Sequence, residues 1–365
     1  MKRREFFKST VAGAVAAGGL AAPAIAQSMP EIKWRLSSAF PKSLDILYST
    51  GETLARHVAE STDGKFQIQS FAAGEIVGTM QALDAISTGT VEMTHTSSYY
   101  YNGKSPVFAL MTSVPFGMNA RQQNAWMSQG GGIDMCNAFL KKYNVCALPG
   151  GHTGTQMGGW FRKEINSIED FRGLKFRVAG MAGQILATLG VVPQQIPPAD
   201  IYPALERGSI DAVEFSGPYD DEKLGFVKVA PYYYFPGFWE GGPTTHFMFN
   251  LDKWNELPKH YQAALRDAAA FANADMTAKY DTRNPAALRR LVGAGAQPRA
   301  FKTEIMEAAF IAANAYYDDL ASKDSDFKAM WTSYKAFRDE EYFWFQVAEY
   351  SYDSFMIRML RNRGG

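Results

Sequence analysis

An eight-residue pattern that occurs twice constrains the fold of this chain more than any other feature. Residues 85–92 read A-I-S-T-G-T-V-E, and residues 204–211 read A-L-E-R-G-S-I-D. Each copy has the order of a helix end, a glycine just past the helix, a small hydroxyl residue, and an apolar–acidic pair that opens a strand. Because each copy closes a strand–helix–strand stretch, the repeat predicts two similar α/β lobes.

The alternation of strands and helices defines the predicted fold class. Residues 32–36 and 66–70 alternate apolar and polar side chains as strands do, and leucines at helical spacing lie between them, from about residue 43 to residue 64. This order predicts a parallel or mixed sheet with helices on both faces. Ligands of such sheets gather outside the carboxyl ends of the strands. We therefore predict an α/β fold with two lobes, a ligand cleft between them, and long C-terminal helices.

Length and composition support this fold and exclude one class of function. A chain of 365 residues exceeds one ordinary core, and 47% hydrophobic with 20% charged residues is typical of a globular protein. The 37 basic and 37 acidic residues leave no net charge. A protein that binds nucleic acid normally has a basic excess, so we expect no nucleic-acid partner.

The N-terminus has the pattern of an export signal. Basic residues, among them Arg3 and Arg4, precede an apolar run at residues 11–22, and small residues follow, with a cut expected after Ala26. The apolar run is too short to span a membrane. The adjacent arginines followed by Phe-Phe-Lys predict export by the twin-arginine route, with an ordinary secretory signal as the alternative.

The residues that most often carry catalysis or bind metals show no recognisable spacing. Cys136 and Cys146, on a predicted helix and a predicted strand, are expected to be buried free thiols, with a disulfide as the alternative. No G-x-S-x-G, H-E-x-x-H, C-x-x-C or Walker motif is present. The histidines are scattered. His57 is expected on the surface of a helix, and the other four are expected to be structural, at positions 95, 152, 246 and 260. The sequence therefore predicts that the protein is not an enzyme.

The C-terminal segment predicts a long aromatic helix over residues 327–360. Phe343, Val347, Tyr350 and Phe355 recur along it. Two interpretations stay open: the helix packs on the protein's own core, or its aromatic face contacts a second copy of the chain in a homodimer.

Several short segments mark the family to which this chain is similar. The arginine pair with the export signal, G-E-I-V at residues 74–77, F-R-G-L-K-F-R at residues 171–177 and the second repeat copy through Glu214 occur together. In combination they resemble the substrate-binding subunit of tripartite ATP-independent periplasmic (TRAP) transporters. Y-D-D-E-K-L-G-F at residues 219–226 and E-G-G-P at residues 240–243 narrow the resemblance to the branch that binds 2-oxo acids such as pyruvate.

The resemblance implies a periplasmic receptor. Such a protein binds a small 2-oxo monocarboxylate together with a metal ion and delivers it to the membrane permease subunits of a TRAP transporter. A receptor for a 2-hydroxy acid such as lactate is one alternative. An exported metal-dependent enzyme that acts on small carboxylic acids is another, although the sequence shows no base or nucleophile with a partner at a recognisable spacing.

The resemblance also implies the residues of the site. Arg177 ends a predicted strand, and its guanidinium can hold the solute's carboxylate with two parallel hydrogen bonds. Glu214 would repel that anion unless a cation lay between them. The resemblance assigns this cation to oxygens of Gln156, Glu214, the main chain of Phe215, and Glu240. These hard donors suit Na⁺, with Ca²⁺ as the alternative.

Three tyrosines and the same glutamine are predicted to contact the solute. Tyr99, Tyr100 and Tyr101 follow the first copy of the repeat, and their hydroxyls can bond a carboxylate. Three adjacent residues cannot all face one side of a strand, so at most two are expected to reach the cleft. Gln156 is expected to serve both the solute and the cation.

The predicted organisation has five parts. They are the export signal at residues 1–26, a first lobe at 27–150, a second lobe at 151–240, a return to the first lobe with interlobe helices at 241–325, and a C-terminal helix at 326–365 that is a possible dimer contact.

Overall fold

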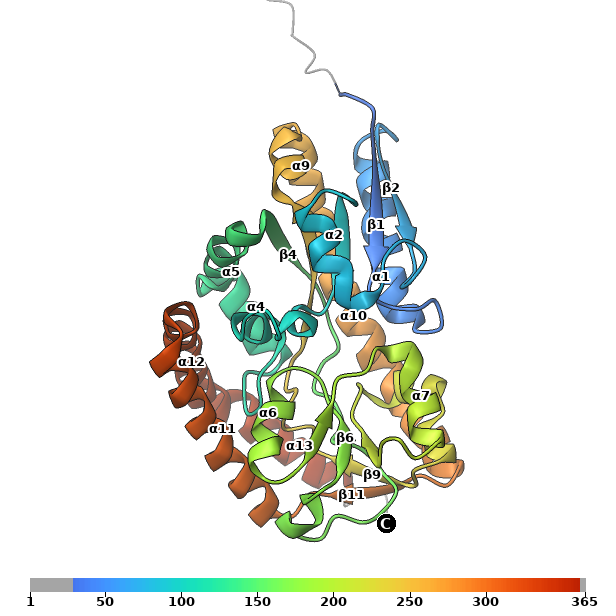
Figure 1. Ribbon diagram of the computed structural model, residues 1–365, viewed down its shortest axis with the longest axis vertical. Helices are drawn as coiled ribbons and strands as arrows, with labels where there is room; N and C mark the ends of the chain where they lie inside the picture. The colour runs from blue at the N-terminus through green and yellow to red at the C-terminus, as the bar shows by residue number, and fades with distance from the viewer. Residues whose placement is uncertain (1–28, 362–365) are drawn as a thin grey trace, which may run out of the picture. The chain divides into compact units, whose positions relative to one another are not determined.

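The computed structural model describes residues 29–361 (Figure 1). The strands and helices of this range lie in one compact unit that begins at Glu31. The predicted export signal at residues 1–26 lies outside the described residues. Within the described range, none of the helices combines the length and the hydropathy that crossing a membrane requires.

Two mixed sheets form the framework, as the predicted α/β class requires. The first sheet has the order β2-β1-β3-β10-β4. β1 is parallel to β2 and β3, whereas β10 is antiparallel to both β3 and β4. The strands of this sheet are β1 (Ile32–Ser38), β2 (Phe66–Phe71), β3 (Met93–Thr96), β4 (Val145–His152) and β10 (Thr244–Asn250).

The second sheet has the order β11-β9-β5-β8-β6-β7. β6 is parallel to β7 and β8, while β5 is antiparallel to β8 and β9, and β11 is parallel to β9. Its strands are β5 (Gly159–Phe161), β6 (Lys175–Arg177), β7 (Val192–Gln194), β8 (Ala212–Val213), β9 (Tyr232–Phe235) and β11 (Gln297–Ala300).

The repeated segment has the same backbone in both sheets. Gly89 and Gly208 both have a φ of 74°, the left-handed conformation that favours glycine after a helix. In the first copy the amide of Thr90 donates to the carbonyl of Ala85 at 2.8 Å, and in the second the amide of Ser209 donates to Ala204 at 2.9 Å. Each copy leads into a strand, β3 or β8, that pairs in parallel with an earlier strand of its own sheet. The predicted pair of similar lobes is confirmed.

The helices cover both sheets, and one helix, α10, packs against elements of both. α10 is 35 residues long and packs against α1 and β4 of the first sheet and against α8, which follows β8 of the second. The helices are α1 (Asp45–Ser61), α2 (Ala82–Ser87), α3 (Val107–Thr112), α4 (Ala120–Gln129), α5 (Gly132–Leu140), α6 (Met181–Thr188), α7 (Pro198–Glu206), α8 (Pro218–Leu224), α9 (Leu251–Glu256), α10 (Lys259–Gly293), α11 (Thr303–Lys323), α12 (Ser325–Phe345) and α13 (Ser351–Arg361).

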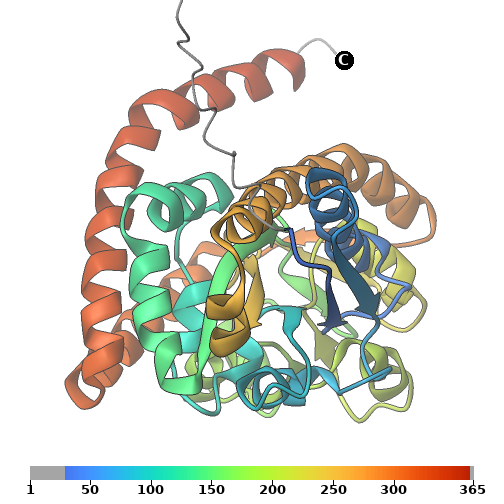
Figure 2. The same ribbon diagram turned by 90° about the horizontal axis from the view of Figure 1, so that it is seen from above.

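The long C-terminal helix predicted over residues 327–360 is present as α12 and α13, joined by one π-helical segment, Gln346–Tyr350. Figure 2 shows these helices curving along one side of the described chain. The cysteines lie on the elements that the sequence predicts, Cys136 on α5 and Cys146 on β4, and both are free thiols. Cys136 is buried as expected, whereas Cys146 is only partly buried.

The predicted lobe boundaries at 150/151 and 240/241 stay a proposal. They fall close to the two crossings between the sheets, from β4 to β5 and from β9 to β10. The stretch 241–325, expected to return to the first lobe, contributes β10 to the first sheet and β11 to the second.

Three histidines are buried in the first sheet, on β3, β4 and β10. His95 Nε2 lies 3.0 Å from both the Gly150 carbonyl and Thr245 Oγ1. Neither ring nitrogen of His246 has a hydrogen-bond partner among the described residues. Burial lowers the pKa of His95 and of His152 to about 4. Burial, with the neighbouring His152 and His95, lowers the pKa of His246 to about 3, so the three rings are neutral at pH 7.

His246→Leu is expected to weaken the loss of stability in acid. A histidine whose folded-state pKa lies below its unfolded value near 6.5 destabilises the fold as the pH falls, because only the unfolded chain takes up the proton. Between pH 7 and pH 5 the wild type should lose about 2 kcal/mol more than the variant in the free energy of unfolding. Urea denaturation at both pH values measures this difference. Parallel pH dependence of the two proteins would contradict it, and between pH 7.5 and 8.5 the gap should stay constant.

Candidate functional site

Side chains from five places in the fold come together near the crossings between the two sheets. Arg177 is the last residue of β6, and Glu214 directly follows β8. Gln156 and Glu240 lie on the two crossings between the sheets, and Tyr99 follows β3. Three of these five residues therefore stand at the carboxyl ends of parallel strands, where open α/β sheets bind ligands.

Arg177 is a buried guanidinium with one long ion pair. Its side chain is 1% exposed, and Nη1 lies 3.6 Å from Glu214 Oε2. Nε donates to the Ile196 carbonyl at 3.2 Å, and Nη1 donates to the main-chain carbonyl of Glu214. The ring of Phe215 lies 5.4 Å from the guanidinium carbon, within the range of a cation–π contact. None of these contacts is the paired two-bond geometry that a guanidinium forms with a carboxylate.

Two buried carboxylates share this region. Glu214 is fully buried and Glu240 is 3% exposed. Burial raises the pKa of Glu214 to about 7, against the opposing effect of Arg177. Burial also raises the pKa of Glu240 well above its usual range, and the charge of Glu214 raises it further. Two acids at such close quarters cannot both ionise without added positive charge.

Four buried oxygen atoms of the site have no hydrogen-bond donor among the described residues. They are both carboxylate oxygens of Glu214, Oε2 of Glu240 and Oε1 of Gln156. Buried polar atoms are nearly always paired, so this set needs an explanation. Hard oxygen atoms are the ligands that Na⁺ and Ca²⁺ take, and the residues present therefore fit such a cation. No group of three or more His, Cys, Asp or Glu suited to a metal occurs in residues 29–361, in keeping with a set that holds two acids and an amide.

Main-chain hydrogen bonds join the two segments that cross between the sheets and hold Gln156 beside Glu240. The main-chain amide of Gln156 donates to the main-chain carbonyl of Glu240 at 3.1 Å, and the amide of Gly237 donates to the main-chain carbonyl of Gln156 at 3.0 Å. A Cβ at Gly237 would lie 2.5 Å from that carbonyl oxygen, so the close approach requires glycine. Gln156 Nε2 donates to Thr153 Oγ1 at 3.0 Å, which commits the amide nitrogen and leaves Oε1 as an acceptor.

The three tyrosines form a 3₁₀ turn, Ser98–Tyr101, and the strand geometry assumed for them from the sequence is wrong. Burial raises the pKa of Tyr99 well above its usual range, and the charges of Glu240 and Glu214 contribute. Burial raises the pKa of Tyr100 to about 12, and Arg177 opposes this. Tyr99 and Tyr100 thus lie in the electric field of the site. The Tyr101 hydroxyl is instead 3.0 Å from Thr96 Oγ1, and its ring packs on Phe108.

Sequence reasoning missed the loop after β7. Gln195 Nε2 donates to the Tyr100 carbonyl at 3.2 Å, which ties the tyrosine turn to the second sheet, and the Ile196 carbonyl holds Arg177 Nε. No motif marks these residues. The one signal that could have indicated them is their position just after a parallel strand, because ligands of α/β sheets bind at the carboxyl ends of strands. The same rule located Arg177 and Glu214.

Comparison with known proteins gives a consistent picture. Residues 37–324 match the family model of bacterial extracellular solute-binding proteins, family 7. The chain is 47% identical, over 97% of its own length and 99% of the relative's, to a monocarboxylate 2-oxoacid-binding periplasmic protein of Nostoc sp. strain PCC 7120.

Two solved structures resemble the fold closely. One is a TRAP transporter solute-binding protein from Bordetella bronchiseptica, a mixed-occupancy dimer with copurified calcium and picolinate in one active site and an apo second site. It is 47% identical, with a TM-score of 0.90 over 92% of this chain and 99% of that one. The other, from Pseudoalteromonas atlantica, holds sodium and pyruvate. It is 35% identical, with a TM-score of 0.86 over 89% of this chain and 99% of that one.

Glu240→Gln is expected to stabilise the cation-free protein at pH 7.5 and to remove most of the stabilisation by Ca²⁺. A raised folded-state pKa means that the contribution of the acid to stability is lost as the pH rises through that value, and glutamine carries no such charge. At a hundredfold excess over its dissociation constant, Ca²⁺ should stabilise the wild type by about 2.7 kcal/mol, or roughly 5 °C in Tm. Thermal denaturation in choline buffer with and without CaCl₂ measures both effects.

The exposed Glu52 offers a matched control for this substitution. Glu52→Gln removes the same charge from the surface of α1 and should respond to Ca²⁺ as the wild type does. An undiminished Ca²⁺ response in Glu240→Gln would remove Glu240 from the cation site.

Proposed function

The chain belongs to family 7 of the bacterial extracellular solute-binding proteins, and we propose that it is the periplasmic receptor of a TRAP transporter that binds a small 2-oxo monocarboxylate, such as pyruvate, with a cation. It then delivers the solute to the membrane permease subunits. One observation carries the proposal. Arg177 is a buried guanidinium whose ion pair with Glu214 is long, at 3.6 Å, and lacks the two parallel hydrogen bonds of a close pair. It stands beside buried oxygens of Gln156, Glu214 and Glu240 that lack hydrogen-bond donors among the described residues.

The chemistry of a 2-oxo acid matches both halves of this site. Its carboxylate accepts two parallel hydrogen bonds from Arg177. One carboxylate oxygen and the adjacent 2-oxo oxygen can also close a five-membered chelate ring with a cation. Picolinate, which the Bordetella relative holds with calcium, likewise has an acceptor atom next to its carboxylate. The shared feature is a carboxylate with a neighbouring acceptor, and that is the solute class we propose.

The charges of the site require a cation when the solute is bound. Ionised Glu214 and Glu240, protonated Arg177 and a monocarboxylate together carry two negative charges. Buried charge without compensation is costly, so this arrangement by itself should hold no anion. Na⁺ leaves one negative charge and Ca²⁺ leaves none. We propose Na⁺ as the resident ion, with Ca²⁺ as the alternative, at Gln156, Glu214, the main chain of Phe215, and Glu240.

The protein's own residues then have separate tasks. Arg177 orients the carboxylate, and Gln156 presents Oε1 to the solute and the cation because its amide nitrogen is already committed. Tyr99 and Tyr100 close the cleft from the first lobe. Tyr99 lies against Gly180 of the second lobe, where an added Cβ would be 3.4 Å from the tyrosine Cβ. Tyr101 stays a predicted solute contact. In this structure its hydroxyl is hydrogen-bonded to Thr96 Oγ1.

A 2-hydroxy acid such as lactate is the second candidate solute. Its hydroxyl is also next to the carboxylate and adds one proton to donate. The acceptors without donors at Gln156 and Glu240 can receive that proton. Competition between lactate and pyruvate in one titration decides between the two solutes.

We propose that the protein has no catalytic role, in keeping with its membership of a receptor family. Glu214 and Glu240 are the acids nearest the proposed solute, and both are assigned to the cation. Incubation with pyruvate followed by NMR should show an intact, bound acid. We also propose export to the periplasm by the twin-arginine route, on the basis of Arg3 and Arg4.

Arg177→Lys is expected to weaken pyruvate binding strongly while the fold stays intact. An ammonium cannot reproduce the two parallel hydrogen bonds, and breaking a buried charged pair costs about 2–5 kcal/mol. Isothermal titration calorimetry with pyruvate in sodium buffer measures the loss. Lys175→Ala changes an exposed cation on the same strand and should bind as the wild type does.

The same titration in three buffers tests the cation. After chelation, pyruvate should bind poorly in choline chloride and regain its affinity in NaCl or CaCl₂, because the ion and the solute stabilise each other. Equal affinity in all three buffers would mean that no metal bridge exists. Near-native affinity of Arg177→Lys would remove Arg177 as the carboxylate clamp.

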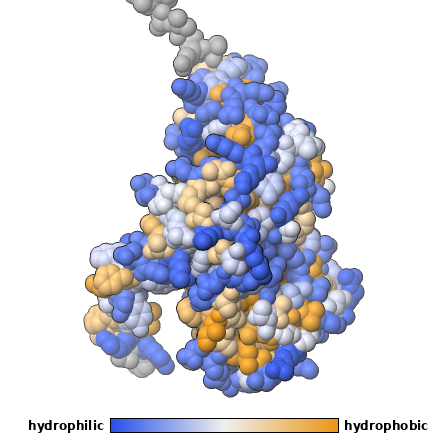
Figure 3. Space-filling view, turned by 60° about the vertical axis from the view of Figure 1, so that its left-hand side comes forward, coloured by the Kyte–Doolittle hydropathy of each residue, from blue (hydrophilic) through white to orange (hydrophobic). Residues whose placement is uncertain are grey.

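We further propose that the C-terminal helix contacts a second copy of the chain. α13 has no buried residue within this one chain. Phe343, Val347 and Tyr350 are 72%, 63% and 70% exposed, and Phe355 and Ile357 on α13 are 50% and 68% exposed. Figure 3 shows hydrophobic residues on this projecting segment, at the lower left. An apolar stripe of this kind marks an interaction surface, and the Bordetella relative is a dimer.

Val347→Asp combined with Phe355→Asp is expected to convert the dimer into a monomer. Two charges in an apolar contact leave buried anions without partners. Light scattering coupled to size exclusion should give the mass of two chains for the wild type and of one for the variant. Ile311→Asp, at an exposed apolar residue of α11, serves as the control and should stay dimeric. A wild type with the mass of one chain would contradict the proposal.

A further inference from the structure

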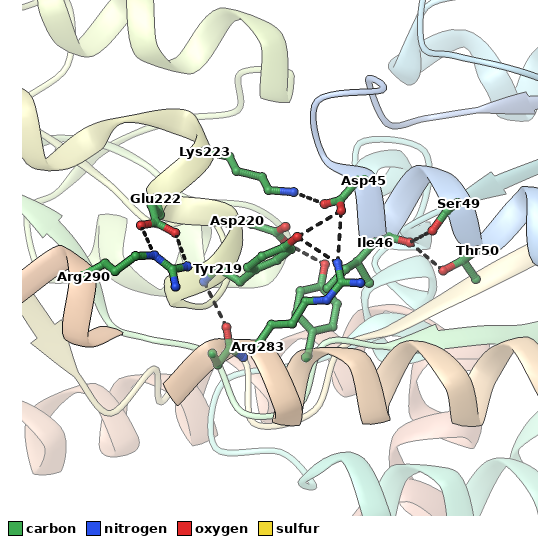
Figure 4. Close-up of polar contacts among 12 residues, drawn as sticks. Asp45, Ile46, Ser49, Thr50, Tyr219, Asp220, Glu222, Lys223, Arg283 and Arg290 are labelled. Carbon is green, nitrogen blue, oxygen red and sulfur yellow. Dashed lines mark hydrogen bonds and ion pairs between the residues drawn. The ribbon is translucent and has the colours of Figure 1, made fainter. Parts of the chain in front are cut away.

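A cluster of polar side chains outside the proposed site joins three helices (Figure 4). The carboxylate of Asp45 accepts a hydrogen bond from the Tyr219 hydroxyl at 3.0 Å and another from Arg283 Nη1 at 3.1 Å. Lys223 Nζ donates to the other carboxylate oxygen. Arg283 Nη1 also donates to the Tyr219 hydroxyl at 2.8 Å. Asp45 therefore receives three donors, two of them cationic.

These residues come from different parts of the fold. Asp45 opens α1, which packs against β1 and β2 of the first sheet. Tyr219 and Lys223 are on α8, which follows β8 of the second sheet, and Arg283 is on α10, which packs against both α1 and α8. The cluster thus connects the first lobe to the second.

Two further contacts fix α8 to the second sheet. Asp221 Oδ2 accepts from the Trp160 indole of β5 at 3.0 Å and from the Tyr233 hydroxyl of β9 at 2.6 Å. All three side chains are buried. A buried carboxylate with two donors is held firmly, so α8 must move together with the second sheet.

The same helix is continuous with the proposed cation site. Only four residues separate Glu214 from Tyr219 along the chain. Within that stretch the Ser216 carbonyl accepts from the Met157 amide at 3.1 Å, next to Gln156. A movement of α8 away from α1 would therefore carry Glu214 and Phe215 away from the first lobe.

We propose that Asp45, Tyr219, Lys223 and Arg283 form a latch between the lobes that slows the release of solute and cation. The idea rests on the proposed receptor function, and it adds residues that contact neither the solute nor the ion. These four are positioning residues.

The strength of the contacts suits a device that must also open. The side chains of Asp45, Lys223 and Arg283 are 45%, 26% and 39% exposed. Ion pairs at such exposure contribute little individually and are screened by salt. Burial alone would raise the pKa of Asp45, but Lys223, Tyr219 and Arg283 outweigh it and lower the pKa, so the carboxylate is charged at neutral pH. Three donors on the Asp45 carboxylate together favour the closed arrangement of the lobes. Because each contact is weak, the lobes can still open.

The neighbouring pair Glu222–Arg290 supplies a matched control. Arg290 Nε and Nη2 donate to the two oxygens of Glu222 at 2.8 and 2.7 Å. This pair joins α8 to α10 and has no partner on α1. Its loss removes an ion pair from the same two helices while leaving the contacts of Asp45 unchanged.

Stopped-flow fluorescence of pyruvate release in CaCl₂ tests the latch. Asp45→Asn should release pyruvate about three- to tenfold faster, with an unchanged association rate and an unchanged Tm. Tyr219→Phe should have a smaller effect in the same direction, and Glu222→Gln should have none. Raising choline chloride from 0.05 to 0.5 M should speed release from the wild type but not from Asp45→Asn, because screening acts on the charges that the variant lacks.

A second measurement does not depend on pyruvate. Spin labels at the exposed residues Gln67 of the first lobe and Arg207 of the second report the distance between the lobes, in a Cys146→Ser background because Cys136 is fully buried. In ligand-free protein, Asp45→Asn should shift the distribution towards longer distances, whereas Glu222→Gln should not. Identical distributions, or identical release rates, for Asp45→Asn and the wild type would overturn the latch. A wild type that binds no pyruvate would overturn pyruvate as the proposed solute and leave the distance comparison to decide on the latch.

Discussion

Two buried carboxylates, Glu214 and Glu240, share a single guanidinium, that of Arg177. The binding of solute and ion depends on how this unbalanced buried charge is compensated. Burial raises the pKa of both acids, and the charge of Glu214 raises the pKa of Glu240 further. Arg177 Nη1 lies 3.6 Å from the Glu214 carboxylate. Arg177 offsets one negative charge at most. A cation together with a carboxylate anion supplies the missing partners of both signs, so ion and solute should bind as one unit.

The fold builds this group from distant parts of the chain. The two sheets contribute residues at their parallel strand ends, Arg177 after β6 and Glu214 after β8, while the paired crossings contribute Gln156 and Glu240. No single lobe holds the complete set, because the tyrosine turn belongs to the first sheet and Arg177 to the second. On the proposed assignment of residues, closing the lobes would assemble the site and exclude water, which would strengthen each electrostatic contact inside it.

The buried group of Glu214, Glu240 and Arg177 and the exposed Asp45 cluster differ in the strength of their interactions. The buried charges bind a matching solute and its ion strongly. The half-exposed Asp45 cluster adds only a modest, salt-sensitive contribution to closure of the lobes. A receptor that delivers its solute to a permease needs weak contacts between its lobes and strong contacts to the solute. The contacts that keep the lobes together can then break while each lobe keeps its own core, and buried pairs such as Asp221 with Tyr233 keep α8 on the second sheet.

The sequence by itself determined the two α/β lobes, the strand-end positions of Arg177 and Glu214, and the long C-terminal helix. These follow from local patterns, since a glycine such as Gly89 or Gly208 needs a left-handed backbone wherever the chain goes. The family resemblance added Gln156 and Glu240, which no local pattern marks. Only the tertiary structure decided that Tyr99–Tyr101 form a turn, that Gln195 ties this turn to the second sheet, and that Asp45 meets Lys223, 178 residues away. Periodicity reports which face of an element is buried, but it carries no information on which distant element covers that face.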